Sequence, residues 1–444
     1  MLENTNFEMI RYTLDNMGDA VCVTNRRGEL SYLNPAAETL LGISLIPGKV
    51  TKIWEAIPYV ETNDDLIQLF IQAIQSRENA RQMLVKYQNT EGRISQVRVS
   101  LTYKKEEGLF LIIISDLTEL FRVTNAFVRY TSPQIADYVL HAPGGDSQGG
   151  KSKELSILFA DLRGFTALSS SLPPEQFVSM INRFFEKQVQ VVYRFRGTVI
   201  EFLGDCIFAI FGAPTDDPDH APHALACAIE MQNAMDEINQ MNRADGWPDL
   251  SLGIGINSGT AIVGNIGSRD KMKYGCIGET VNLASRVEVL TVGGEILISE
   301  NTAKLISEPL DIADEREFMP KGGRRPMKAL LITGMGSEYR LKNQPHEMSW
   351  NTLKKEKEIT FHFLDEHKSV TDAVYSGVFT AVAPDGSYAM LSSATDLASS
   401  ADIMIDIGGS LYAKVTGHEN GAAIVCFTSK PGCFDSWLSS LSGL

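Results

Sequence analysis

Strand-like and helix-like segments alternate between Leu155 and Leu290, and this order constrains the fold more than any other feature of the sequence. Two of the predicted strands are joined by a tight turn at Gly204-Asp205, so we expect them to pair antiparallel. The order therefore predicts a region with an antiparallel or mixed sheet covered by helices. The predicted elements are a strand (Ser156–Ala160), a helix (about Pro174–Phe195), a hairpin (Thr198–Phe211), a helix (about His220–Met241), a strand (Leu250–Asn257) and a helix (about Val281–Leu290).

Such a sheet is of ferredoxin-like type rather than a Rossmann fold, because its strands after the first helix are linked by hairpins. The whole chain of 444 residues is too long for one hydrophobic core, so two or three domains are expected. We therefore predict a multidomain protein that mixes α+β and α/β units.

Charge and cysteine content exclude several classes of protein. The net charge of −15 and the pI near 5.0 argue against a general binder of nucleic acid or anionic membrane, since the long-range field repels polyanions. Any phosphate site must therefore be local and metal-assisted. The six cysteines show no C-x-x-C spacing, so neither a zinc site nor a disulfide framework is indicated. The longest purely apolar run, Leu109–Ile114, is far below the roughly 20 residues of a membrane span. We expect no nucleic-acid partner, no membrane insertion and a cytoplasmic location.

Residues 1–120 predict a small α/β domain. Asn34-Pro35 supplies the cap and the first turn of a short helix. With the closing Asp116-Leu117-Thr118, the order of elements resembles a PAS sensor domain, and the alternative is a generic α/β dimerisation domain. No His precedes His141, which removes the usual axial ligand of haem, so the signal and ligand of such a sensor are unknown. Strands are expected at Val21–Thr24, at Leu30–Leu33, at the alternating Val97, Val99 and Leu101, and at Leu109–Ile114.

Residues 121–152 are expected to form a helical and then flexible linker. A short heptad-like stripe indicates either an ordinary packed helix or a dimeric signalling helix between two domains. The Gly-rich composition of Ala142–Lys153 predicts flexibility. The stripe consists of Leu117, Phe121, Thr124 and Val128.

Four blocks further along the chain carry a family resemblance. In order they read FADLRGFT (159–166), FLGD (202–205), GINSG (255–259) and GETVNLASR (278–286). Together they resemble the catalytic domain of class III nucleotidyl cyclases, and the expected domain covers residues 153–335. The resemblance implies attack of the ribose 3′-oxygen on the α-phosphorus, with pyrophosphate leaving. Two divalent ions, Mg²⁺ or Mn²⁺, are implied as cofactors, because they stabilise charge on both reacting oxygens.

The resemblance assigns the metal ions to Asp161, at the end of the first strand, and Asp205, in the hairpin turn. Taken alone, each Asp has a simpler interpretation, since Gly-Asp is a common turn pair and Asp often caps a helix. The stretch Arg163-Gly164-Phe165-Thr166 is implied to wrap the triphosphate with backbone N–H groups at the start of a helix.

Asn282 and Arg286 are four residues apart and therefore share one face of their helix. They match the family's ribose-orienting Asn and the Arg that stabilises the α-phosphate. Lys321 matches the late Lys that contacts the β- and γ-phosphates. In the family, the metals and phosphate loop come from one chain, and the base reader, Asn, Arg and Lys come from the other. This chain carries both sets, which implies a homodimer with two equivalent sites.

Glu201 and Gly275 occupy the positions that select the base. Adenylyl enzymes of the family usually carry Lys and Asp or Thr there, whereas guanylyl enzymes carry Glu with Cys or another small residue. An ionised Glu accepts hydrogen bonds from guanine N1–H and N2–H₂, but adenine N1 is itself an acceptor. Gly275 offers no donor for guanine O6, which must be met by backbone, water or a neighbour such as Cys276. The prediction is a guanylate cyclase acting on GTP; the alternatives are an adenylate cyclase acting on ATP and a non-catalytic nucleotide-binding scaffold.

Residues 346–444 predict a separate β-rich domain, a small barrel or sandwich. It distantly resembles PilZ-type barrels, which bind cyclic di-GMP through an Arg pair, but no Arg follows Arg340. A structural module, with a possible protein partner, is therefore the expectation. Strands are expected at Ile359–Leu364, Tyr375–Val382, Ile403–Ile407, Leu411–Val415 and Ala422–Thr428.

Overall fold

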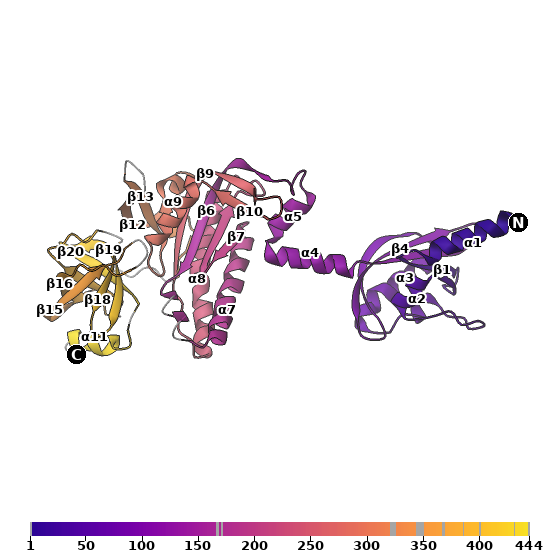
Figure 1. The fold of residues 1–444 in the computed structure, drawn as a ribbon, viewed down its shortest axis with the longest axis horizontal. Coiled ribbons are helices and arrows are strands. Elements are labelled where there is room, and N and C mark those ends of the chain that lie inside the picture. The colour runs from indigo at the N-terminus through magenta and orange to yellow at the C-terminus, as the bar shows by residue number, and fades with distance from the viewer. Residues whose placement is uncertain are drawn as a thin grey trace. The chain divides into compact units, whose positions relative to one another are not determined.

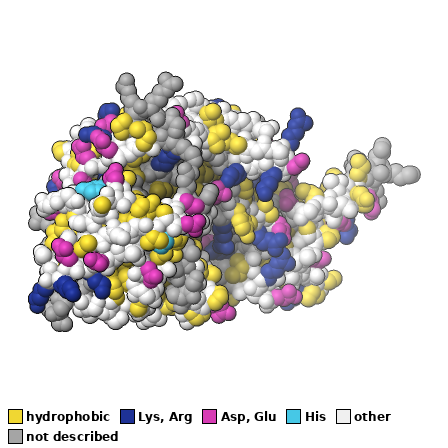
Figure 2. All heavy atoms as spheres, turned by 60° about the vertical axis from the view of Figure 1, so that its left-hand side comes forward, with side chains coloured by type: hydrophobic (Ala, Val, Ile, Leu, Met, Phe, Trp, Pro, Cys, Tyr) yellow, Lys and Arg dark blue, Asp and Glu magenta, His cyan; other side chains and the backbone are white. Residues whose placement is uncertain are grey.

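The computed structural model describes residues 2–165, 168–169, 172–319, 326–342, 350–365, 369–384, 386–398, 401–429 and 431–442. The chain folds as two compact units, Met1–Tyr130 and Thr131–Leu444. No helix in these described ranges is both long and apolar enough to cross a membrane. Figure 2 shows acidic, basic and apolar side chains interspersed over one face of the protein.

The first unit is built on a five-stranded antiparallel sheet with the order β2-β1-β5-β4-β3. Figure 1 draws this unit from α1 at the N-terminus to α4. Apolar side chains of α2 and α3 pack against this sheet in a single core. The elements are α1 (Leu2–Asp15), β1 (Ala20–Asn25), β2 (Leu30–Leu33), α2 (Pro35–Leu41), the 3₁₀ turns η1 (Ile53–Glu55) and η2 (Glu61–Asn63), α3 (Asp64–Ser76), β3 (Ala80–Gln88), β4 (Ile94–Lys104), β5 (Leu109–Asp116) and α4 (Thr118–Tyr130).

Asn34 begins α2 as the sequence predicts. Its Oδ1 accepts from the backbone N–H of Ala37 at 2.9 Å, and Pro35 fills the first helical position. The same oxygen accepts from Val21 N at 2.9 Å, which fixes the helix start to β1. The predicted cap and the four predicted strands of this unit are confirmed, as β1, β2, β4 and β5.

The tripeptide Asp116-Leu117-Thr118 joins the sheet to α4. Asp116 Oδ1 accepts from the N–H of Thr118 at 2.9 Å, and the Thr118 hydroxyl in turn accepts from Gln96 N at 2.9 Å. Within α4, all of whose residues are described, none is buried. Leu120 and Val123 are 61% and 62% exposed, so the helix presents apolar side chains outside the core of its own unit.

The second unit contains a nine-stranded mixed sheet with the order β12-β13-β11-β9-β6-β8-β7, in which β10 also pairs with β9 and β14 with β13. Only β11 and β9 run parallel among these described strands. The elements are α5 (Pro133–His141), β6 (Gly149–Leu162), α7 (Pro174–Arg194), β7 (Thr198–Leu203), β8 (Cys206–Phe211), α8 (His220–Ala244), β9 (Leu252–Gly267), β10 (Met272–Ile277), α9 (Glu279–Val289), β11 (Ile296–Ser299), α10 (Glu300–Ala303), β12 (Leu310–Phe318), β13 (Met327–Met335) and β14 (Tyr339–Arg340).

Helices cover both faces of this sheet, and β6 shows how the sequence sorts its side chains between them. Successive residues of a strand point to opposite faces. Leu158 and Ala160 join the core beneath α7 and α8, whereas Ile157 and Phe159 face α5 and α9. The strand is thus apolar on both sides, as expected for the centre of a sheet.

The strand β6 begins earlier than the sequence suggests. We expected Ala142–Lys153 to be a flexible linker, and this is wrong for its last five residues, which pair with Ala261–Asn265 of β9. Glycines are needed here for a close approach of two backbones, because a Cβ on Gly264 would overlap Gly149 O and Gly150 Cα. Composition alone could not separate this use of glycine from flexibility.

A closed six-stranded barrel ends the chain, with the order β15-β16-β17-β20-β19-β18. The predicted barrel is confirmed, and all five predicted strands are present, but the short strand β17 was not predicted. Phe434 and Trp437 of α11 pack on the barrel core. The elements are β15 (Asn351–Phe363), β16 (Tyr375–Val382), β17 (Tyr388–Ser392), β18 (Asp402–Asp406), β19 (Ser410–Glu419), β20 (Ala422–Ser429) and α11 (Phe434–Ser442).

Candidate active site

Asp161 and Asp205 lie at the same end of two paired strands. Asp161 is near the end of β6, and Asp205 occupies the turn between β7 and β8. In the β6–β8 register, Ala160 is opposite Ile207, so Asp161 continues toward the turn that carries Asp205. The structure therefore places the two predicted metal ligands beside one another, although 44 positions separate them in the sequence.

The charges of both carboxylates act on the same neighbours. Burial first, and then the Asp161 and Asp205 carboxylates, raise the pKa of the Cys206 thiol to about 12. Burial lowers the pKa of the Arg163 guanidinium, and the same two carboxylates oppose that shift. Two adjacent carboxylates supply the hard oxygen ligands that Mg²⁺ and Mn²⁺ prefer, so the donor set fits the implied ions.

Arg163 has a different environment from the one expected. Its backbone N–H donates to Ser251 O at 2.8 Å, and its side chain turns inward to pair with Glu288 and to donate to Thr291 Oγ1 at 3.1 Å. The guanidinium also lies 3.8 Å from Asp161 Oδ1. The expectation that this residue's N–H wraps the triphosphate is therefore corrected: that N–H is used on Ser251, and Arg163 ties the end of β6 to α9.

Two glycines of β9 make room for this arrangement. A Cβ on Gly255 would overlap the backbone of Glu288, and one on Gly253 would overlap both Arg163 and Thr291. The helix α9 therefore lies directly on β9, at a distance that only glycine permits. The GINSG block begins at the second of these two glycines, so part of its sequence pattern has a packing cause.

Helix α9 carries Asn282 and Arg286 one turn apart. Ala284 and Val287 are fully buried beneath the helix, whereas Asn282 is exposed and Arg286 is half-buried. The helix begins after Gly278, which has a φ of 146°, a conformation that favours glycine. The predicted helix is confirmed, and its polar face is available to a second molecule.

The two positions predicted to select the base, Glu201 and Gly275, lie on β7 and β10. A register shift between Val199 and Glu201 marks a bulge just before the Glu, and bulges re-aim side chains. Glu201 Oε2 is 2.6 Å from Lys273 Nζ, and Lys273 is two residues before Gly275 on the same side of β10. A Cβ on Gly275 would meet only Ile266 Cδ1 at 3.6 Å and Lys273 O at 4.0 Å, so there is space beside the ion pair.

Cys276 does not lie on that side of β10. With Tyr274 it belongs to the core between the sheet and α5, and burial raises the pKa of its thiol to about 12. Cys276 was one of the predicted donors for guanine O6, and its burial among apolar side chains argues against that role.

The remaining predicted phosphate contacts are only partly described. Gly164 adopts a φ of 71°, and its carbonyl accepts from Leu168 N at 3.1 Å in a helical turn. Phe165 packs against Phe177 with ring centroids 5.1 Å apart. Thr166 and Lys321 lie outside the described residues.

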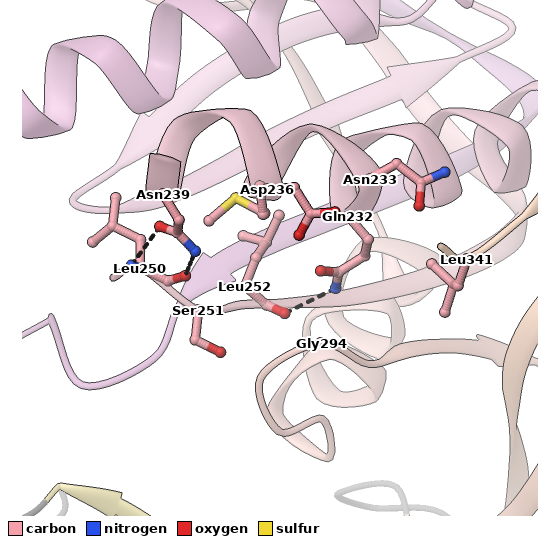
Figure 3. Close-up of a pocket in the computed structure, with 10 residues that line it drawn as sticks. Gln232, Asn233, Asp236, Asn239, Leu250, Ser251, Leu252, Gly294 and Leu341 are labelled. Atoms are coloured by element: carbon pink, nitrogen blue, oxygen red, sulfur yellow. Dashed lines mark hydrogen bonds between the residues drawn. The ribbon is translucent and has the colours of Figure 1, made fainter. Parts of the chain in front are cut away.

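A pocket of about 160 Å³ lies between α8 and the start of β9, and its described lining contains none of the predicted site residues (Figure 3). Its amides bind backbone rather than facing the pocket unpaired: Gln232 Nε2 donates to Leu252 O at 2.8 Å, and Asn239 Nδ2 donates to Leu250 O at 2.8 Å. These two bonds fix the backbone on either side of Ser251, whose carbonyl accepts from Arg163 N. The polar lining of the pocket therefore has a structural role.

Three further residues contribute to the site and were not predicted from the sequence. Lys273 and Glu288 are partners of predicted residues, and Asn257 Nδ2 donates to Thr280 O at 2.9 Å at the start of α9. Only Lys273 had a usable signal, since a Lys two residues before Gly275 on a strand shares its face.

A carboxylate pair at one end of a mixed sheet covered by helices, with Asn282 and Arg286 one turn apart on α9, is the arrangement expected of a nucleotidyl cyclase catalytic domain. Residues 148–334 match the family model of the adenylate and guanylate cyclase catalytic domain, and residues 8–117 match that of the PAS fold. The chain belongs to the class III nucleotidyl cyclases and carries an N-terminal PAS domain.

Relatives of both base specificities are similar to this chain. Adenylate cyclase 1 of Rhizobium meliloti (strain 1021) is 38% identical over 143 residues, which are 32% of this chain and 22% of that protein. Adenylate cyclase of Anabaena cylindrica is 31% identical over 193 residues, 42% of this chain and 36% of that protein. The chain thus spans well under half the length of these curated relatives.

Two solved structures cover the catalytic domain. The guanylyl cyclase Cya2 is 41% identical with a TM-score of 0.43, over 44% of this chain and 100% of that one. The adenylyl cyclase CyaB from P. aeruginosa is 34% identical with a TM-score of 0.40, over 42% of this chain and 96% of that one.

Proposed function

We propose that this protein is a guanylate cyclase that converts GTP to 3′,5′-cyclic GMP and pyrophosphate. The observation that carries the proposal is Glu201, a carboxylate at the base-selecting position, beside Gly275. A carboxylate accepts from guanine N1–H and N2–H₂ but repels the lone pair of adenine N1. The relatives are named adenylate and guanylyl cyclase alike, so the assignment of the base depends on this side chain.

Asp161 and Asp205 would hold the two divalent ions, Mg²⁺ or Mn²⁺, which when bound neutralise triphosphate charge and ease loss of the ribose hydroxyl proton. Asn282 orients the ribose, and Arg286 stabilises the negative charge that develops at the α-phosphate. Gly164 and Phe165 belong to the phosphate loop. Thr166 and Lys321 complete the phosphate contacts in the proposal.

Two copies of the chain form two equivalent sites, each with the metals from one copy and the base reader, Asn282 and Arg286 from the other. The PAS domain supplies the regulatory input in signal transduction. The C-terminal barrel offers a surface for a protein partner, and the enzyme acts in the cytoplasm.

One observation favours the alternative, an adenylate cyclase acting on ATP. Lys273 Nζ lies 2.6 Å from Glu201, and an ammonium group is the kind of donor that adenine N1 accepts from. The Lys273 ammonium group would have to leave Glu201 to donate to adenine N1. Guanine can bind to the Glu201 carboxylate while the ion pair stays intact. The non-catalytic scaffold is the second alternative.

The test is turnover of the purified full chain with Mn²⁺ and either GTP or ATP, with Glu201→Lys/Gly275→Asp as the variant. Cyclic GMP from the wild type and a shift toward cyclic AMP in the variant support the proposal. Asp205→Asn serves as the background control. Cyclic AMP from the wild type would support the alternative instead, and no turnover by a metal-loaded dimer would support the scaffold.

A further inference from the structure

A line of buried polar side chains crosses the mixed sheet of the second unit, away from the metal and base positions. It begins on α8 and passes through β6, β9, α10 and β11 before returning to β9. No member is more than 8% exposed, so bulk water cannot complete its hydrogen bonds. In order, the members are His220, Ser156, Ser258, Thr302, Ser299 and Asn257.

Each member lies within hydrogen-bond distance of the next. The successive distances are 2.8 Å from His220 Nδ1 to Ser156 Oγ, 2.6 Å to Ser258 Oγ, 3.0 Å to Thr302 Oγ1, 3.2 Å to Ser299 Oγ and 2.6 Å to Asn257 Oδ1. At the far end, Asn257 Nδ2 donates to Thr280 O at 2.9 Å. Thr280 lies in the first turn of α9, two residues before Asn282.

The Thr280 carbonyl fixes the direction of every bond in the line. A carbonyl only accepts, so the amide nitrogen of Asn257 must face it, and Asn257 Oδ1 must face Ser299. Ser299 has a single hydroxyl proton, and it is used on Asn257. Thr302 must therefore donate to Ser299.

The same reasoning continues to the other end. Because the Thr302 proton is used, Ser258 donates to Thr302, and Ser156 donates to Ser258. The hydroxyl of Ser156 then has no proton left for the imidazole. His220 must donate from Nδ1, in the less common neutral tautomer.

We infer that these six side chains form a proton-ordered chain, in which His220 carries its proton on Nδ1 and Asn257 is the positioning residue for α9. The second half of the inference rests on the proposed function, since it concerns the helix that bears Asn282 and Arg286. Bonds that all point one way polarise one another, which favours the ordered state over mixtures of directions.

The tautomer is measured directly by nitrogen NMR of the full chain labelled at its seven histidines. Burial lowers the pKa of His220, against the raising effect of Asp217, Glu154 and Asp219, so near pH 8 the ring is neutral. The His220 signals, assigned with His220→Gln, should show protonated Nδ1 and bare Nε2. A neutral ring protonated on Nε2 in the wild type overturns the inference.

Thr302→Val removes one link with little change of volume. Ser258 then loses its acceptor and can turn toward Ser156, which frees Ser156 to donate to the ring. We expect signals of the Nε2–H tautomer to appear. Thr198→Val is the matched control, because its buried hydroxyl donates to Ala213 O at 2.9 Å outside the chain and should leave His220 unchanged. An identical His220 spectrum in Thr302→Val also overturns the inference.

Asn257→Asp tests the positioning of α9. The carboxylate still accepts from Ser299 but repels Thr280 O, so the helix start is displaced. We expect kcat for GTP to fall about tenfold or more with a smaller change in KM, since small misplacements of catalytic groups cost at least this much. Asn239→Asp, which breaks an amide-to-carbonyl bond on α8, should not show this pattern. Equal kcat in both variants contradicts the positioning role.

The NMR experiment and the kinetic experiment allow failure of this inference to be distinguished from failure of the proposed function. The NMR measurement needs no turnover, so a chain with no cyclase activity would refute the proposed function while the tautomer still tests the proton order. A guanylate cyclase with an Nε2–H ring would refute the proton order alone.

Discussion

Arg163 and Glu288 form an ion pair across 125 sequence positions, with their side chains only 17% and 8% exposed. One partner follows Asp161, a proposed metal ligand, by two residues, and the other follows Arg286 of α9 by two. The pair therefore ties the Asp161 end of β6 to the helix that carries the proposed transition-state Arg.

Glu288→Ala should destabilise the second unit by up to about 3–5 kcal/mol, because it leaves the buried Arg163 charge with only the more distant Asp161 carboxylate, 3.8 Å away, to pair with. Asp249→Ala breaks the exposed Arg243–Asp249 pair and should cost about 1 kcal/mol or less. Denaturant unfolding of both variants checks the difference. Equal losses would show that the buried pair contributes no more than a surface one.

Gly255→Ala should displace α9, since the new methyl group would overlap the backbone of Glu288. Overpacking of this kind costs about 1–3 kcal/mol, and activity should fall with it because Asn282 and Arg286 move. Gly417→Ala is a matched strand control, as no atom lies within 4 Å of its added Cβ. A melting temperature and kcat unchanged in Gly255→Ala would contradict the close approach.

Arg316 and Glu295 make a second buried pair, with Nη2 to Oε1 at 2.5 Å and Nη1 to Oε2 at 2.8 Å. Arg316→Met alone leaves the buried Glu295 carboxylate without its cation and should lower the free energy of unfolding by about 3–5 kcal/mol. Arg316→Met/Glu295→Gln removes both charges and should recover part of that loss. If the double variant is no more stable than Arg316→Met, the loss in the single variant does not come from an unpaired buried carboxylate.

Protonation of His220 should lower the free energy of unfolding as the pH is lowered. Its pKa is lowered by burial, so between its native pKa and the usual 6.5 the unfolded chain binds more protons than the folded chain. Stability therefore rises with pH in that window and is lost as pH falls below about 6.5. His220→Gln, which cannot titrate, should flatten the melting temperature in this range, and a profile parallel to the wild type would exclude His220 as the cause.

Asp161→Asn and Asp205→Asn should each abolish Mn²⁺-dependent turnover, because an amide lacks the negative charge that holds a divalent ion. Binding of Mn²⁺ with nucleotide, followed by electron paramagnetic resonance, provides a readout other than activity. Asp270→Asn, in the exposed β9–β10 turn, is the charge-matched control. Unaltered Mn²⁺ binding in both site variants would remove these residues from the metal site.

The parts of the site that short motifs carry were predictable from the sequence. Asp161, Asp205 and the helix with Asn282 and Arg286 lie where their blocks placed them, because local turn and helix signals decide those positions. The inward turn of Arg163 was not predictable, since its cause is Glu288, a partner distant in the sequence.

The same distinction holds for the fold. Asn34 begins α2 as its cap chemistry requires, whereas the early start of β6 depends on Gly264, a residue of another strand. Lys273 beside Glu201 is a contact between two strands that no local pattern specifies. Local chemistry thus predicted the elements, and contacts between elements decided what was missed.

Gly150, Gly264 and Gly275 stand in one row across β6, β9 and β10. The place where the chain enters the catalytic domain is therefore only two strands from Gly275, one of the residues proposed to select the base. Helix α5 contacts the same ribbon, with Tyr138 against Tyr274 at 5.6 Å between ring centroids. Asp161 is at the opposite end of β6. A movement transmitted through the start of β6 would therefore reach Gly275 over a shorter path than Asp161.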